Sequence, residues 1–274
     1  MIQTLILLSI AFCLICLVFL LPIITEFRRD RIRNKPFPPR WKFILRKNFL
    51  IYKSLPKNLQ SRLKGHIQVF MAEKQFIGCD GLELNDDIKV TIAAIACLLL
   101  LNERGEYYPK LRSILVYPTA YMVTTRQAFG DYGIAESKEA RLGESRSRDL
   151  VILSWEQIKY DLNHWQDGHN VILHEFAHQL DQEDGIANGV PILSKKQDYL
   201  NWAKFFTREY KQLIADVKNG QKTVMYSYAT TNPAEFFAVA TETFFEKPQE
   251  MEQNLTNIYN LLKNYYKLDP TGWF

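Results

Sequence analysis

The sequence predicts a helix-rich α+β domain preceded by one transmembrane helix. The chain of 274 residues opens with a run from Met1 to Thr25 in which no side chain is charged. The remainder carries several segments with apolar residues at helical spacing, and short apolar runs typical of strands occur in its middle third. With 47% hydrophobic and 23% charged residues, a long disordered protein is excluded. The four cysteines indicate neither a disulfide framework nor a zinc site of paired C-x-x-C motifs.

Residues 2–24 predict a membrane-spanning helix. As an α-helix this segment would be about 35 Å long, enough to cross a hydrocarbon core of about 30 Å. A cleaved signal peptide is the alternative, but it would need basic residues before the apolar run and small residues at a cleavage site, and the sequence has neither. Because the cluster Arg28-Arg29-Asp30-Arg31-Ile32-Arg33 follows the run, the positive-inside bias places the body of a single-pass protein in the cytoplasm.

A basic segment follows the apolar run. Residues 26–47 contain nine Lys or Arg side chains and two acidic ones, whereas the rest of the chain after them has 25 basic and 28 acidic residues. The local excess indicates topology and contact with lipid headgroups, and we expect no nucleic-acid partner. Three prolines within 34–41 predict a short semi-rigid linker. We therefore divide the chain into an anchor at 2–24, a basic Pro-containing linker at 25–41 and a domain at 42–274.

Apolar periodicity places the elements of the domain in order. Helices are expected over 42–76 with a break near Pro56, and over 88–101, 171–180, 199–217, 234–246 and 255–266. Segment 88–101 is too short to cross a bilayer, so we expect a buried core helix there. Strands are expected within 111–124, which Pro118 interrupts, and at 150–153. The polar residues 125–149 between them predict a loop or hairpin.

One pentapeptide carries the chemistry. His174-Glu175-Phe176-Ala177-His178 matches the pattern H-E-x-x-H. Residues four apart lie above one another on a helix, so both imidazoles can reach one ion at about 2.0–2.1 Å. Glu175 lies one step round the helix and can reach a water on that ion. Asn170 and Gly185 are typical residues for the start and the end of such a helix. An amphipathic helix with surface histidines is the alternative, but three of the five histidines lie within 169–178.

A catalytic zinc ion needs a third protein ligand and an open position. Asp184 stands where the longer pattern H-E-x-x-H-x-x-G-x-x-H has its last histidine, but Asp181 replaces the glycine that would let the chain turn back. His169 precedes the helix and is expected to be a cap or loop residue. Glu235 is the stronger candidate, because it lies in the first turn of an otherwise apolar helix, where an unpaired carboxylate is costly. Acidic residues also favour helix N-termini without any metal.

Longer stretches around these residues resemble the Mlc titration factor A family of zinc-dependent peptidases, whose catalytic fold is similar to that of anthrax lethal factor. The resemblance is carried by residues 168–181 (GHNVILHEFAHQLD), 183–185 (EDG), 228–239 (YATTNPAEFFAV) and 244–248 (FFEKP). Weaker similarity extends over about residues 41–274. The resemblance implies a zincin-like metallopeptidase domain, and with the anchor we expect it at the bacterial inner membrane, facing the cytoplasm.

The resemblance also implies the composition of the site. One Zn²⁺ per chain is expected on His174, His178 and Glu235, with Glu175 as the general base. Tyr228 is expected to donate its phenol O–H to the oxyanion, and packing on the core is the alternative for this side chain. Aminopeptidase activity is suggested by the resemblance alone, since no residue can be identified that would accept the amine terminus of a substrate.

Two further acids are candidates for orienting the imidazole of a metal-binding histidine by accepting a hydrogen bond from its other ring nitrogen. Asp181 follows His178 by three residues, and an exposed acid at the helix end is the alternative interpretation. Glu242 shares a helix face with Glu235 and is a weaker candidate of the same kind.

The predicted function is therefore that of a membrane-anchored zinc peptidase acting on a peptide or protein substrate. Glu175 takes a proton from water as the water attacks a peptide carbonyl, and returns it to the leaving amine. Residues 150–153 are a candidate edge strand for pairing with an extended substrate. The alternative is a regulatory binding module that sequesters a cytoplasmic transcription regulator, with the zinc site secondary. An intact Glu175 favours the peptidase, because a purely structural site needs no base. The anchor leaves open whether the family's binding to the glucose repressor Mlc applies.

Overall fold

The computed structural model describes residues 4, 20–102, 107–128, 134–141, 143–147 and 149–273. The predicted anchor at 2–24 therefore lies outside the described residues, apart from residue 4 and residues 20–24. Over the ranges that are described, no helix is both long enough and apolar enough to span a membrane.

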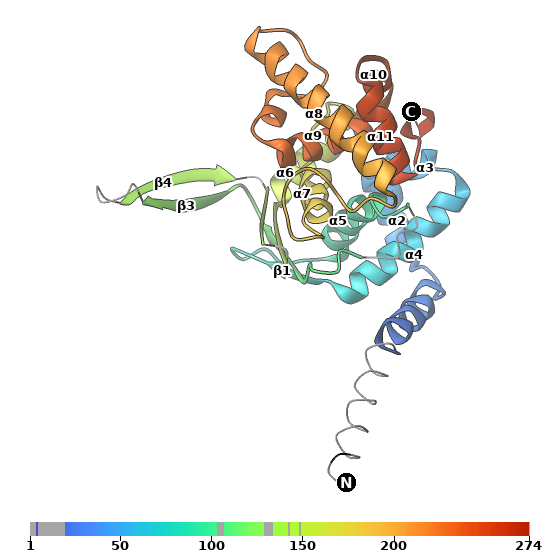
Figure 1. Cartoon of the computed structure of the whole chain (residues 1–274). Coiled ribbons are helices and arrows are strands. Elements are labelled where there is room, and N and C mark those ends of the chain that lie inside the picture. The colour runs from blue at the N-terminus through green and yellow to red at the C-terminus, as the bar shows by residue number, and fades with distance from the viewer. Residues whose placement is uncertain are drawn as a thin grey trace.

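Helices make up most of the domain (Figure 1). Residues 20–33 are helical. They are followed by α2 (Pro39–Asn48), α3 (Ile51–Ser54), α4 (Lys57–Glu73), α5 (Asp86–Leu98), α6 (Trp155–Asn163), α7 (Val171–Asp181), α8 (Lys196–Lys218), α9 (Pro233–Glu246), α10 (Pro248–Asn254) and α11 (Thr256–Tyr266), with short 3-10 helices η2 (Ser227–Thr230) and η3 (Pro270–Trp273). The helix-rich α+β class expected from the sequence is confirmed.

The small sheet has the strand order β1-β2-β6-β5. Its strands are β1 (Gln75–Gly78), β2 (Ser113–Tyr117), β5 (Gly143–Ser147) and β6 (Leu150–Ser154). The first three in that order are parallel, with Ser113 opposite Leu150 and Tyr117 opposite Ser154, and β5 runs antiparallel to β6. A separate antiparallel pair is formed by β3 (Tyr121–Ala128) and β4 (Ile134–Arg141).

The prediction of an edge strand at 150–153 is wrong. Strand β6 has β2 on one side and β5 on the other, so β5 is the edge of the sheet on that side. The sequence Gly143-Glu144-Ser145-Arg146-Ser147 is polar throughout, and it lacks the apolar alternation by which strands are recognised. The expected loop or hairpin at 125–149 is thus a hairpin followed by this polar edge strand.

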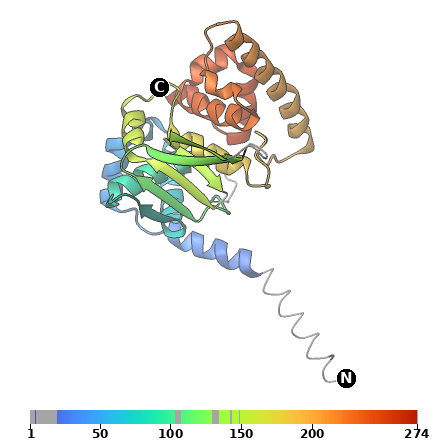
Figure 2. The same ribbon diagram turned by 90° about the vertical axis from the view of Figure 1, so that its left-hand side faces the viewer.

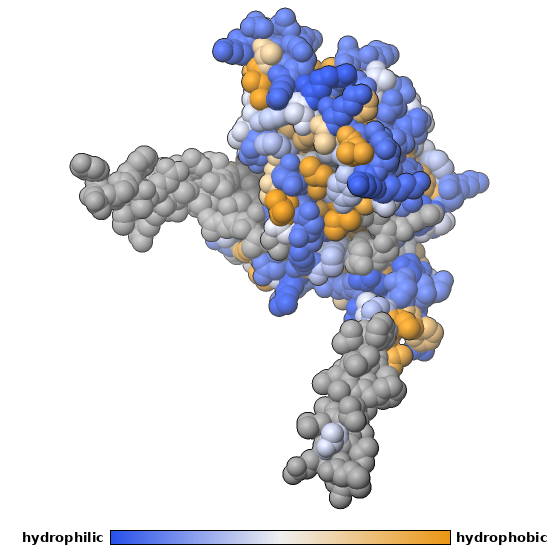
Figure 3. Space-filling model, in the orientation of Figure 1, coloured by the Kyte–Doolittle hydropathy of each residue, from blue (hydrophilic) through white to orange (hydrophobic). Residues whose placement is uncertain are grey.

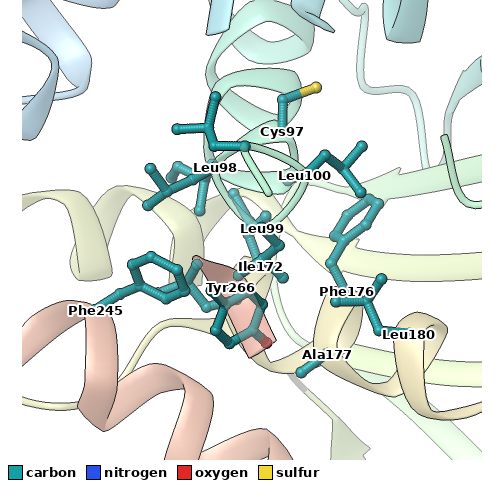
Figure 4. Close-up of a cluster of buried hydrophobic side chains, with 14 of the residues drawn as sticks. Cys97, Leu98, Leu99, Leu100, Ile172, Phe176, Ala177, Leu180, Phe245 and Tyr266 are labelled. Atoms are coloured by element: carbon teal, nitrogen blue, oxygen red, sulfur yellow. The ribbon is translucent and has the colours of Figure 1, made fainter. Parts of the chain in front are cut away.

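Helix α7 lies at the centre of the domain. Figures 1 and 2 show the C-terminal helices α8–α11 gathered in the upper part of the molecule, with the sheet and helices α2–α5 below them. Helix α7 packs on α9 above, and on α5, β5 and β6 below. Buried side chains join the two parts (Figure 4), among them Leu99, Ile172, Phe176, Phe245 and Tyr266. Helix α5 is buried along most of its length, as its apolar sequence predicts.

The segment expected as a linker at 25–41 is packed against the body. Arg29 Nε lies 3.0 Å from Glu73 Oε1 on α4, and Arg33 Nη1 donates to the Tyr107 hydroxyl at 3.2 Å. Pro39 takes the first position of α2, where its missing N–H costs nothing. Proline content alone therefore overestimates the length of the irregular stretch. The helical segment 20–33 also exposes apolar side chains (Figure 3), namely Leu20, Leu21, Ile23, Ile24 and Phe27.

Candidate metal centre

The local sequence explains why α7 starts where it does and which way it faces. Asn170 is the N-cap, and its Oδ1 accepts from the Leu173 amide at 3.1 Å. The apolar residues Ile172, Leu173, Phe176 and Leu180 are buried in the core. His174 and His178, one turn apart, are left on the side of the helix that meets α9.

Helix α9 supplies the third group at its first turn. Asn232 caps this helix by accepting from the Glu235 amide at 3.0 Å, and Pro233 occupies the first helical position. The carboxylate of Glu235 thereby points at the two imidazoles. Its Oε2 lies 3.0 Å from His174 Nε2 and 3.3 Å from His178 Nε2.

The three predicted ligands meet at one point. His174 Nε2 and His178 Nε2 are 3.2 Å apart, and the ligand atoms of all three residues lie within 4.8 Å of one another. Two imidazole nitrogens cannot face each other at this distance with both lone pairs free, so the space between them requires a proton or a cation. Two nitrogens and one carboxylate oxygen form a ligand set that Zn²⁺ uses in catalytic sites. The residues present therefore fit a zinc ion.

Glu242 fixes the proton on the far side of His174. Its Oε1 lies 2.8 Å from His174 Nδ1 and also accepts from the Tyr226 hydroxyl at 2.8 Å, while Oε2 accepts from the Asn170 amide at 2.6 Å. A carboxylate can only accept, so Nδ1 carries the proton and Nε2 faces Glu235. This is the arrangement that the sequence suggested for Glu242 as its weaker candidate.

Charge and burial have opposite effects on the pKa values of His174 and Glu235. Burial lowers the pKa of His174, but the carboxylates of Glu242 and Glu235 outweigh it and hold that pKa well above its usual value. Burial raises the pKa of Glu235, yet hydrogen bonds from His174 and His178 bring it far below normal. The Glu235 carboxyl group is therefore an anion, as a metal ligand must be.

Glu175 is a buried carboxyl group next to the three ligands. Glu175 is only 4% exposed, and its Oε2 atom has no hydrogen-bond partner in the part of the chain that is described. Burial raises the pKa of Glu175 to about 7, in spite of the lowering effect of His174 and His178. An unpartnered oxygen of this kind is available to accept a proton from a water molecule.

The two tyrosines of η2 and its N-cap have different surroundings. Tyr228 is 49% exposed, and its ring centroid lies 6.0 Å from that of His174, on the open side of the site. Core packing, the alternative for this residue, is not what the structure shows. Tyr226 instead points inward to Glu242, and burial raises the pKa of its hydroxyl far above the usual value. The sequence does not indicate a role for Tyr226, because its hydrogen-bond partner lies sixteen residues away.

Asp181 is turned toward the loop after α7. The residue is fully buried, and its two oxygens accept from the amides of Gly189 and Val190, each at 2.9 Å. The alternative of an exposed acid at the helix end is therefore wrong. The hydrogen bonds described for Asp181 go to loop amides and not to an imidazole, so its expected role in orienting a ligand histidine stays a prediction. Of the other residues considered, Asp184 accepts from the amide of Ile186. The ring of His169 packs on Tyr226, with 3.9 Å between the centroids.

Two buried carboxyl groups that the sequence did not identify hold the start of α7. Asp161 accepts from the Val171 amide at 2.8 Å. Glu246 accepts from the Gly168 amide at 3.0 Å and from Asn170 Nδ2 at 3.1 Å. Burial raises the pKa of Asp161 to about 7 and that of Glu246 to about 9. In the sequence both look like ordinary helix acids, because their partners lie at the first residue of α7 and in the loop before it.

Comparison with known proteins agrees with the motifs. The family described as glucose-regulated metallo-peptidase M90 matches residues 24–267. A protein of Synechocystis sp. (strain ATCC 27184 / PCC 6803 / Kazusa), described as uncharacterized, is 43% identical over 271 residues, or 98% of each chain. Mlc titration factor A of Yersinia pestis (strain Pestoides F) is 28% identical over 217 residues, covering 77% of this chain and 78% of the relative. Mlc titration factor A of Yersinia pseudotuberculosis serotype O:1b gives the same values.

Proposed function

Because the chain belongs to the glucose-regulated metallo-peptidase M90 family, we propose that it hydrolyses peptide bonds at the site formed by His174, His178 and Glu235, with zinc as the metal. One observation carries the proposal. Two imidazole nitrogens and a carboxylate oxygen from α7 and α9 converge within 3.0–3.3 Å, directly beside a buried carboxyl group with an unpartnered oxygen.

The side chains around the metal have distinct tasks. When bound, the ion supplies Lewis-acid polarisation of a carbonyl group and acidifies water. Glu175 accepts a proton from the attacking water and returns it to the leaving amine, and a pKa of about 7 suits both directions near neutral pH. Tyr228 donates its hydroxyl hydrogen to the developing oxyanion from the exposed side. Glu242 keeps the proton on Nδ1 of His174.

The test of the proposal is the Glu175→Gln variant. The substitution keeps the size of the side chain and removes the base, so we expect peptide cleavage to fall by about 10²–10⁴-fold. Zinc content, measured by elemental analysis of the purified chain, should stay near that of the wild type. Glu156→Gln is the control, since Glu156 is an exposed acid of α6 away from the ligands. Wild-type cleavage by Glu175→Gln would remove the base from the mechanism. Profiling on a peptide library distinguishes an aminopeptidase from an endopeptidase.

A second candidate function is binding of a transcription regulator. Its support is that relatives over 77% of the chain carry the name Mlc titration factor A. A module that only binds keeps its effect on a regulator-dependent transcription reporter when Glu175 is replaced by Gln. A peptidase that acts by cleavage loses that effect. The reporter assay on this single variant therefore separates the two functions.

We also propose that residues 2–24 attach the chain to the bacterial inner membrane with the domain in the cytoplasm. The support is the uncharged sequence of this segment and the basic residues that follow it. The full chain should sediment with membranes after an alkaline wash, and a chain lacking residues 2–24 should not. Protection of the domain from protease added outside the inner membrane tests the orientation. A full chain that stays in the supernatant would refute the anchor.

A further inference from the structure

The loop between α7 and α8 is fastened at Gly189. The Gly189 amide donates to Asp181 Oδ2 at 2.9 Å, and its carbonyl oxygen accepts from Trp202 Nε1 at 2.9 Å. The next amide, that of Val190, donates to the other oxygen of Asp181 at 2.9 Å. Asp181 is fully buried and Trp202 is 2% exposed. The loop is therefore held from two sides by side chains of the neighbouring helices.

At the same point the loop lies against the start of α9. A Cβ atom added to Gly189 would be 2.3 Å from the carbonyl oxygen of Pro233 and 2.8 Å from its carbonyl carbon. The two nearest atoms thus belong to the backbone, which cannot bend away as a side chain can, and the third is Cζ of Phe206 at 3.0 Å. Pro233 is the first residue of α9 and stands two residues before Glu235. The fastened loop therefore touches the helical turn that presents the third ligand.

We propose that Asp181, Gly189 and Trp202 form a clamp that sets the position of Glu235 against the two imidazoles, an inference that rests on the proposed metal site. The physical link is short. Helix α7 carries His178 and, three residues later, Asp181, which holds Gly189 by its amide. Gly189 abuts the first turn of α9, so the separation of the two ligand-bearing helices is set by a hydrogen bond and a close backbone contact. The clamp residues are positioning residues, because they act through Glu235.

Gly189 has a matched set of controls in the same chain. It has φ +76°, a conformation that side chains with a Cβ rarely adopt. Gly81 at φ +78° and Gly220 at φ +68° share this conformation, but nothing lies within 4 Å of a Cβ added to either. Alanine at all three positions thus introduces the same backbone strain, and only at position 189 does it push against Pro233.

The experiment measures the zinc affinity of the purified full-length chain by competition with a chelator. We expect Gly189→Ala to bind zinc about 10–100-fold more weakly than the wild type, as when supporting residues of metal ligands are changed. Gly81→Ala and Gly220→Ala should bind as the wild type does. The visible spectrum of the Co²⁺-loaded chain should change only in Gly189→Ala, since it reports the ligand geometry rather than the stability of the fold.

A double-mutant cycle with Glu235→Ala identifies the route of the effect. If the clamp acts through Glu235, adding Gly189→Ala to that variant weakens zinc binding no further. An additive loss, or a Gly189→Ala affinity equal to that of Gly81→Ala, would overturn the clamp. Failure of the wild type to bind zinc would instead overturn the proposed function. If Gly189→Ala does not fold, Asp181→Asn is compared with Asp184→Asn, whose carboxylate also accepts from a loop amide but is not in contact with Gly189 or Val190 in the hydrogen bonds described.

Discussion

Glu242 offers the sharpest test of how the site is built, because this one buried carboxylate accepts hydrogen bonds from three donors. Replacing it by Gln keeps the shape and exchanges one acceptor oxygen for an amino group. If the amide oxygen takes the place of Oε1, it satisfies His174 and Tyr226, and the Asn170 amide then faces an N–H group. If the amide oxygen takes the place of Oε2, the amide NH₂ group faces His174 Nδ1. This favours the tautomer with the proton on Nε2, and a protonated Nε2 cannot bind a metal.

The magnitude follows from these contacts. Leaving one buried donor without an acceptor costs about 1–3 kcal/mol, and turning charge-assisted bonds into neutral ones costs about 1 kcal/mol for each of the other two. We expect the free energy of unfolding of the metal-free chain to fall by about 3–5 kcal/mol. Zinc affinity should fall by about 10–100-fold, which is about 1.4–2.7 kcal/mol.

The assay combines urea denaturation of the metal-free protein with chelator competition for zinc. Glu246→Gln is the matched control, since Glu246 is also a buried acid of α9 that accepts from Gly168 and Asn170, but it makes no bond to an imidazole in the contacts described. It should lower stability and leave zinc affinity within about threefold of the wild type. Equal zinc affinities for Glu242→Gln and the wild type would refute the tautomer argument.

Four further outcomes follow from the structure. Tyr228→Phe should lower kcat by about 10²-fold in steady-state assays without loss of zinc, and an unchanged kcat would exclude the phenol as an oxyanion donor. Asp161 has a pKa raised to about 7, so its contribution to stability is present below the pKa of the unfolded chain near 3.8 and is lost as the pH rises through 7. Asp161→Asn should flatten this decline of stability with pH in urea titrations, and an unchanged slope would contradict the raised pKa. Trp202→Phe should lower the free energy of unfolding by at least about 1 kcal/mol through loss of the hydrogen bond to Gly189. A variant as stable as the wild type would contradict this contribution. Zinc at about 1,000 times its Kd should stabilise the metal-free chain by about 4 kcal/mol in thermal melts, and His178→Ala should abolish most of this gain; a gain of equal size in the variant would place the ion elsewhere.

The sequence predicted those parts of the site that depend on local spacing. His174, Glu175 and His178 share one helical turn, so their relation is fixed by helix geometry wherever the helix lies. Glu235 could be singled out because a carboxylate in an apolar first turn needs an explanation, although the family resemblance was required to choose it. Long apolar helices such as α5 were predicted for the same reason, as their pattern is continuous along the chain.

Contacts between distant segments could not be predicted. Tyr226 reaches Glu242 and Asp181 reaches Gly189 only because α7, α9 and the intervening loop pack together, and neither pair has a spacing that a sequence motif records. The sequence pattern did not predict strand β5, because its pairing with β6 depends on backbone hydrogen bonds, which polar residues make as well as apolar ones. The docking of residues 25–41 likewise depends on Glu73, an acid that lies far along the chain.

The order of the ligands along the chain determines when the centre can form during biosynthesis. His178 and Glu235 are separated by 57 positions, and α9 emerges from the ribosome only after most of the polypeptide has been translated. A growing chain that ends before α9 has two imidazoles and lacks the helix on which α7 rests. Under the proposed function, incomplete copies that lack Glu235 are therefore inert toward the newly made proteins around them, because the third ligand is missing.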